Sequence, residues 1–112
     1  MVNKKALPRC HVETALLFVA DRWKLLIVRE LLTGTKRFGE LKNNLPGISQ
    51  KVLTQNLRTM EEYELIHREA YAEIPPRVEY SLTEAGESLK MIIDTLWQWG
   101  EQWKESMDEG GL

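Results

Sequence analysis

Hydrophobic side chains in the first half of the chain recur three and four positions apart, which is the spacing of one face of an α-helix. Three signals interrupt this repeat: Asp21 can cap a helix start, Gly34 is suited to follow a helix end, and Pro46-Gly47 breaks the helical pattern. The repeat and its interruptions predict four helices, over residues 12–20, 22–32, 37–44 and 49–63.

After residue 64 the apolar residues follow a period of two, which is the period of a β-strand. Residues 67–72 and 77–82 alternate and Glu73 to Pro76 separates them, a pattern that predicts a hairpin with a proline-stiffened tip. An isolated hairpin is barely stable, so it must pack on the helices, as the wing of a winged helix does. Arg77 at the tip is a candidate contact to DNA phosphate or to the minor groove. The alternative is a surface arginine beside acidic neighbours.

The segment over residues 37–63 has the pattern of a helix-turn-helix. Ser49 can cap its second helix, which has one apolar face and no acidic residue from Ser49 to Met60. Gln, Thr, Ser, Lys and Arg side chains can hydrogen-bond base edges and phosphate oxygens in the major groove of DNA. A plain pair of packed helices with a hydrated outer face is the alternative. The candidate DNA-binding residues of this segment and of the position just before it are Lys36, Arg37, Ser49, Gln50, Lys51, Thr54, Gln55 and Arg58.

The predicted last helix, which Thr83 can cap, carries an apolar seam with the four-three spacing of heptads. Trp97, Trp99 and Trp103 lie within seven residues, and one exposed helix of a small domain cannot hide that aromatic area. The pattern predicts a homodimer in which this helix packs on its mate and on the first helix. The alternative is that the tryptophans cover the core of a single copy. The candidate interface residues are Leu16, Leu89, Ile92, Leu96, Trp99 and Trp103.

Length and composition are those of one small domain, with 112 residues, 43% of them hydrophobic and 29% charged. The longest apolar run, Ala15 to Ala20, is too short to span a membrane, and no run typical of a signal peptide is present. A single cysteine excludes an intramolecular disulfide and suggests a reducing compartment. We therefore expect a cytoplasmic protein without a membrane partner.

The net charge of −2 argues by itself against a nucleic-acid partner, but the charges are unevenly distributed. Residues 1–60 contain 11 Lys and Arg against 4 Asp and Glu, a net charge of +7. Residues 61–112 contain 4 Lys and Arg against 13 Asp and Glu, a net charge of −9. A basic half that includes the suspected DNA-reading helix favours a DNA-binding protein. Chance clustering, with both signs interleaved in space, would give the same counts.

Cys10 is a candidate for a reactive thiol. It directly precedes the first predicted helix, where backbone N–H groups and the helix dipole can stabilise a thiolate, and Arg9 adds a positive charge. Such a thiolate could form a mixed disulfide with a small thiol, or a disulfide with another subunit. An inert, half-buried cysteine is the alternative.

The sequence contains no motif typical of an enzyme or of a metal site. It has no glycine-rich phosphate loop, no cysteine pair with zinc spacing and no nucleophile elbow, and His11 and His67 are far apart. We therefore expect no enzymatic activity, no cofactor and no bound metal. Two rival functions stay open: a winged helix used only for protein–protein contact, and a small-molecule or enzymatic domain, which would need a pocket with convergent polar groups.

Taken together, several motifs resemble the HxlR-type winged helix-turn-helix regulators, which are relatives of the MarR-like repressors and activators. The motifs are Cys10-x-Val12-Glu13, Trp23-Lys24-Leu25-Leu26-Ile27, Arg37-Phe38-x-Glu40-Leu41, Leu45-Pro46-Gly47-Ile48-Ser49-Gln50-Lys51-x-Leu53-Thr54, Leu57-Arg58 and Pro75-Pro76-Arg77-Val78-Glu79-Tyr80-Ser81-Leu82-Thr83. The resemblance implies a bacterial or archaeal transcription factor that dimerises through its terminal helices and binds a palindromic operator. It also implies that Cys10 corresponds to the redox- or electrophile-sensing thiol of some members.

The expected fold is mainly α with a small β-hairpin: a winged helix-turn-helix with a C-terminal dimerisation helix. The expected organisation is a flexible arm over residues 1–9, a domain over residues 10–107 and a frayed tail over residues 108–112. The expected function is sequence-specific binding of double-stranded DNA by a homodimer that regulates transcription, modulated by thiol redox chemistry or electrophiles at Cys10. The sequence does not identify an oxidant or small-molecule effector.

Overall fold

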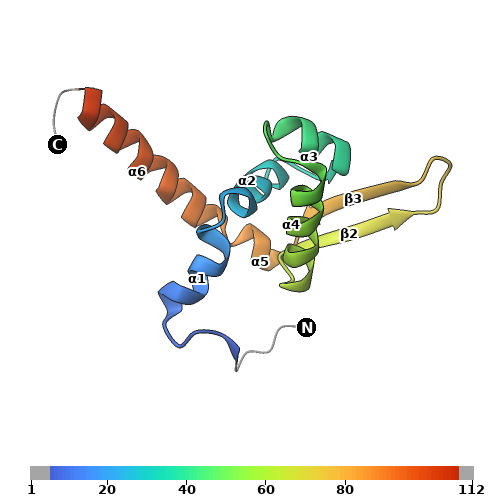
Figure 1. The fold of residues 1–112 in the computed structure, drawn as a ribbon, viewed down its shortest axis with the longest axis horizontal. Helices are drawn as coiled ribbons and strands as arrows, with labels where there is room; N and C mark the ends of the chain where they lie inside the picture. The colour runs from blue at the N-terminus through green and yellow to red at the C-terminus, as the bar shows by residue number, and fades with distance from the viewer. Residues whose placement is uncertain (1–5, 109–112) are drawn as a thin grey trace.

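The computed structural model describes residues 6–108 and contains helices and one small sheet (Figure 1). The elements are α1 (His11–Val19), α2 (Arg22–Leu31), β1 (Lys36–Arg37), α3 (Phe38–Asn44), α4 (Gln50–Glu62), β2 (Ile66–Tyr71), β3 (Arg77–Leu82), α5 (Glu84–Glu87) and α6 (Lys90–Asp108). The predicted winged helix-turn-helix class is confirmed. Residues 1–5 of the expected arm and 109–112 of the expected tail lie outside the described residues.

The three predicted caps start their helices through side-chain oxygens that accept backbone N–H groups. The Asp21 carboxylate accepts from Trp23 N at 2.7 Å and so begins α2. The Ser49 hydroxyl accepts from Val52 N at 3.1 Å and begins α4, and the Thr83 hydroxyl accepts from Gly86 N at 3.0 Å and begins α5. These local bonds explain why the starts of these helices could be read from the sequence.

The core lies between α2, α3, α4 and the sheet. Each element contributes the apolar face that its spacing predicts, and the turn between α3 and α4 adds two further side chains. The buried hydrophobic residues are Ile27, Val28, Leu31, Leu41, Leu45, Ile48, Leu53, Leu57, Met60, Leu65, Ile66, Tyr80 and Leu89. Because the apolar face of α4 is fixed against this core, its opposite face is turned to solvent.

The sheet has three antiparallel strands in the order β1-β3-β2, one more than the hairpin predicted. β2 pairs with β3 from Ile66 opposite Leu82 to Tyr71 opposite Arg77. β1 pairs Lys36 with Tyr80 on the other edge of β3. A two-residue strand is too short to show an alternating pattern, so β1 could be found only through its partner.

The last predicted helix is interrupted, because α5 ends at Glu87 and α6 begins at Lys90. The Leu89 N–H bonds to the Gly86 carbonyl, three residues back, which is a tighter turn than that of an α-helix. This turn places Leu89 in the core, where it is 9% exposed. From there α6 extends away from the body of the molecule, on the side opposite the β2–β3 hairpin, which we call the wing (Figure 1).

Candidate nucleic-acid interface

The polar side of α4 is open to solvent from Gln50 to Arg58, and the exposed acids Glu61 and Glu62 follow in the last turn of the helix. Gln50, Lys51, Gln55 and Arg58 are exposed and Thr54 is half-buried, and together they form what we call the polar face of α4. The opposite side is held in the core by the apolar residues of α4, so the helix has a fixed orientation. This face is free of carboxylates and presents hydrogen-bonding groups that suit base edges and phosphates.

A cleft of about 440 Å³ separates the polar face of α4 from the sheet. Phe38, Leu57 and Tyr80 supply its apolar lining, and Arg58 and Arg68 bring two guanidinium groups to it. Glu61 also lines the cleft and supplies one acid beside these cations. Arg68 is not among the predicted site residues, because a lone arginine next to Glu69 in a strand gives no local signal. Its place is set by the register of β2, in which it stands opposite Tyr80.

Three further candidate residues, Lys36, Arg37 and Ser49, each take part in a hydrogen bond within the protein. Lys36 is half-buried in β1, and its Nζ donates to the Thr33 hydroxyl at 2.9 Å. Arg37 has an exposed side chain, while its backbone N–H donates to the Glu40 carboxylate at 2.9 Å. Ser49 is exposed, but its hydroxyl oxygen already caps α4. DNA contacts by Lys36, Arg37 and Ser49 stay predictions.

Arg77 begins β3 and is paired with acids. Its guanidinium donates to Glu73 at 2.8 Å and to Glu79 at 2.9 Å, and its central carbon lies 3.9 Å from the centre of the Tyr71 ring. The hydrogen bond to Glu73, with the charges of both acids, holds the pKa of Arg77 above its usual value. This geometry matches the alternative of a surface arginine beside acidic neighbours. A DNA contact by Arg77 stays a prediction and would require it to share its carboxylate partners.

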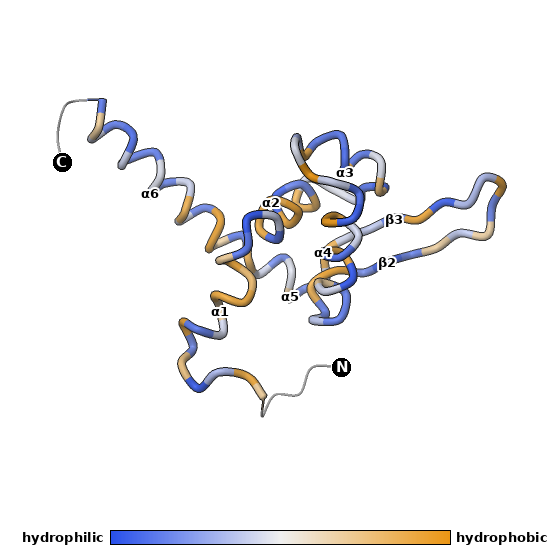
Figure 2. Tube along the Cα trace, in the orientation of Figure 1, coloured by the Kyte–Doolittle hydropathy of each residue, from blue (hydrophilic) through white to orange (hydrophobic). Residues whose placement is uncertain are grey.

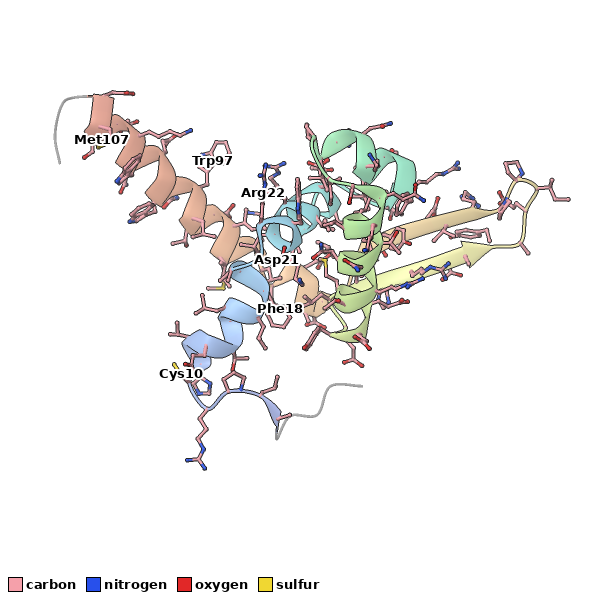
Figure 3. All side chains as sticks on the ribbon, in the orientation of Figure 1. Cys10, Phe18, Asp21, Arg22, Trp97 and Met107 are labelled. Atoms are coloured by element: carbon pink, nitrogen blue, oxygen red, sulfur yellow. The ribbon has the colours of Figure 1, made fainter. Side chains whose placement is uncertain are left out.

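Cys10 occupies the N-cap position of α1, and its side chain is exposed at the outer end of that helix (Figure 3). Its thiol makes no capping hydrogen bond to the helix. The Thr14 hydroxyl lies within reach of two carbonyl oxygens, at 3.2 Å from that of Pro8 and 3.3 Å from that of Cys10. The cysteine is exposed, so the half-buried position of the alternative is wrong, and the reactivity of the thiol stays a prediction.

The apolar seam of α6 is largely uncovered in the single chain. Trp99 is 65% exposed and Trp103 is 44% exposed, and Leu96 and Trp97 are exposed as well. Figure 2 shows hydrophobic positions along the part of α6 next to the body and along α1. The tryptophans therefore do not cover the core of the single chain. Of the other candidate interface residues, Leu16 is exposed, Ile92 is half-buried and Leu89 belongs to the core.

The described residues offer no metal site and no membrane span. Among residues 6–108, no three His, Cys, Asp or Glu side chains gather as they would around a metal ion. None of the helices within the same range combines the length and the apolar composition needed to cross a bilayer.

Known proteins resemble this chain in sequence and in fold. The family model described as HxlR-like helix-turn-helix matches residues 18–108. YdeP of Bacillus subtilis (strain 168), an uncharacterized HTH-type transcriptional regulator, is 43% identical over 100 residues, which are 89% of this chain and 78% of YdeP. The redox regulator HypR in its reduced form superposes with a TM-score of 0.82 at 37% identity, over 89% of this chain and 99% of HypR. The reduced form of the transcriptional regulator YodB from B. subtilis superposes with a TM-score of 0.73 at 34% identity, over 91% and 94% of the two chains. The chain therefore belongs to the HxlR-like helix-turn-helix family and is a transcriptional regulator of the helix-turn-helix type.

Proposed function

We propose that this regulator binds a palindromic operator in double-stranded DNA as a homodimer and does so in the cytoplasm. The observation that carries the proposal is the exposed, acid-free polar face of α4. An α-helix fits the major groove, where amide, hydroxyl and guanidinium side chains distinguish the four base pairs. In this pose, Gln50, Thr54 and Arg58 would contact base edges, and Lys51 and Gln55 would contact bases or phosphates.

The cleft between α4 and the sheet gives this pose a second support. In the proposed complex α4 lies in the major groove. The sugar-phosphate backbone that borders this groove then runs along the cleft between α4 and the sheet, next to Arg58 and Arg68. Contacts to phosphate position a protein on DNA without reading its sequence. Arg68 would therefore add affinity, and the polar face of α4 would add specificity.

The homodimer is supported by the surface that the single chain leaves uncovered. Large apolar side chains on α1 and α6 are exposed, and both helices lie on the side of the molecule opposite the wing (Figure 1). A second copy that covers this surface would leave both polar faces of α4 free. Because a two-fold dimer repeats its contacts, the operator would contain two half-sites about one or a few helical turns apart.

Thiol modulation at Cys10 is also part of the proposal. The thiol is exposed, and HypR is named a redox regulator. With one cysteine in the chain, any disulfide must join Cys10 to another copy or to a small thiol. Forming it removes two electrons and two protons from two thiols, and an oxidant such as diamide accepts them.

Selection of bound sequences from a random duplex library tests the function directly. We expect enrichment of one sequence with two-fold symmetry, and tight binding of that duplex compared with a random one. If no sequence is enriched, specific DNA binding is ruled out. Binding of a protein partner in its place would then favour the rival function, a winged helix used only for protein–protein contact.

Arg58→Ala should weaken binding to the selected duplex by about 1–3 kcal/mol, since Arg58 is placed to contact a base or phosphate. Its thermal stability should stay within about 0.5 kcal/mol of the unaltered chain, as is usual for an exposed position. Titration at fixed salt measures the affinity. Arg29→Ala is the control, because Arg29 is an exposed arginine on α2, away from the polar face of α4. Equal affinities for the two variants would contradict the assigned contact.

Cys10→Ser should abolish the response of DNA binding to diamide. In the unaltered chain, we expect oxidation to change the affinity for the selected duplex by roughly 5-fold or more, the lower end of typical coupling between two sites. Mass spectrometry should identify the disulfide at Cys10 in the same samples. A variant that responds to diamide as the unaltered chain does would remove Cys10 from the sensing role.

A further inference from the structure

The core side of α4 contains one polar residue. Asn56 is 7% exposed and lies among Leu53, Leu57 and Met60 on the buried face of the helix. Its amide nitrogen donates to the Val52 carbonyl at 2.9 Å. Its amide oxygen accepts from Lys24 Nζ on α2 at 3.0 Å. A polar side chain in a core costs free energy unless it is hydrogen-bonded, and here both the nitrogen and the oxygen of the Asn56 amide have a partner.

Lys24 connects this amide to the start of α2. Its side chain is 13% exposed, and its ammonium also lies 2.8 Å from the Asp21 carboxylate. Partial burial raises the pKa of Asp21, but the hydrogen bonds from Lys24 and from the Trp23 N–H outweigh this and lower the pKa below its usual value. Asp21 lies where the chain passes from α1 into α2 (Figure 3). The bonds thus join the α1–α2 junction to the back of α4.

The position of Asn56 on the helix suits it to orient the polar face. At about 100° per residue, Asn56 and Arg58 lie roughly 160° apart around the helix axis. Apolar contacts alone tolerate small rotations and sliding of a helix, whereas a hydrogen bond has a required length and direction. A bond on the back of α4 therefore restricts where its front points.

We propose that Lys24 and Asn56 are positioning residues, whose hydrogen bond, the Lys24–Asn56 bridge, fixes the rotation and the axial position of α4 on α2. The inference rests on the proposed function, because it assigns the bridge a role in DNA specificity. Neither residue touches DNA in the proposed pose. Each acts by holding the polar face of α4 in one register with respect to the base edges.

The test compares the unaltered chain with Lys24→Met, Asn56→Leu and the double variant. Lys24→Met leaves the Asn56 amide oxygen without its donor and removes the ion pair of Asp21, whereas Asn56→Leu leaves Lys24 bonded to Asp21 alone. Both should lower the melting temperature. The double variant replaces both partners of the bridge by apolar side chains of similar size, so it should be more stable than Lys24→Met, although it also lacks the ion pair to Asp21. It should nevertheless lose roughly tenfold or more in the ratio of affinities for the selected and a random duplex, the size of one misplaced base contact.

Arg29→Met is the matched control, because it removes one positive charge from an exposed position on the same helix. It should lower both affinities alike and leave their ratio unchanged. A double variant with the ratio of the unaltered chain would overturn the inference, since the bridge would then serve stability alone.

A readout without DNA separates this inference from the proposed function. In the free protein, amide NMR shifts along the polar face of α4 should move in Lys24→Met, whose substitution lies on α2, and stay in place in Arg29→Met. If the unaltered chain prefers no duplex, the proposed function fails and the α4 shifts decide the role of the bridge. Unmoved shifts would then overturn the positioning role, and moved shifts would support it.

Discussion

A chain carrying Trp99→Ala and Trp103→Ala should sediment as a monomer at concentrations where the unaltered chain forms the proposed dimer. Both side chains are exposed in the single chain and lie on the uncovered seam of α6. Truncating a central aromatic residue of an interface typically costs about 2 kcal/mol or more, and each truncation occurs in both copies. Sedimentation velocity measures the shift from dimer to monomer. Binding to the palindromic duplex should fall with it, since a monomer reaches only one half-site.

Gln98→Ala is the control for this variant. Gln98 is exposed on the same helix, between Trp97 and Trp99 in sequence, and points roughly 160° away from Leu96. It should leave the dimer intact. If the double tryptophan variant sediments as the unaltered chain does, α6 is not the interface and the exposed seam requires another partner.

Gly86→Ala should unfold the domain at a markedly lower temperature. A methyl group at this position would overlap the backbone carbonyl oxygen of Leu65 and come 3.0 Å from a methyl carbon of Leu82. Backbone cannot rotate aside as a long side chain can, so α5 would have to move away from the end of the wing. Overpacking of this kind costs about 1–3 kcal/mol, and each kcal/mol lowers the melting temperature of a small domain by roughly 4–8 °C.

Gly39→Ala provides the matched control for steric overlap. Gly39 is also helical, in α3, but nothing lies within 4 Å of an added methyl group. Because alanine favours a helix more than glycine does, this variant should gain up to about 1 kcal/mol. Differential scanning calorimetry measures the melting temperatures of both variants. A Gly86→Ala chain as stable as the unaltered one would mean that α5 does not pack against Leu65 as described.

The parts of the fold that were predictable are those encoded by neighbours in sequence. The caps at Asp21, Ser49 and Thr83 act over two or three residues, and the helices and the wing follow from local periodicity. The strand β1 and the break before α6 were not predictable, because each depends on contacts between distant residues. β1 exists through its pairing with β3, and the break places Leu89 in the core.

The candidate site likewise has residues that could be predicted from the sequence and residues that could not. The polar face of α4 could be read from its spacing, since one helix carries all of it. No pattern in the sequence indicated that Arg68 lines the cleft, or that Lys24 bonds to Asn56 across 32 positions. The sequence did offer an Arg77 beside acidic neighbours as the alternative, but the strand geometry decides that it reaches both Glu73 and Glu79.

The break at Leu89 has a consequence for how α6 becomes ordered. Ile92 and Ile93 pack against the core, but the turns beyond Leu96 expose their large side chains. An isolated helix of roughly 12–15 residues is only marginally stable in water, and these turns have about that length. In the proposed dimer, their helicity and the pairing of two copies therefore form one coupled equilibrium. Dilution would reduce helix content together with the dimer fraction, so that the amount of protein in the cell would itself govern how much of the regulator is fully folded.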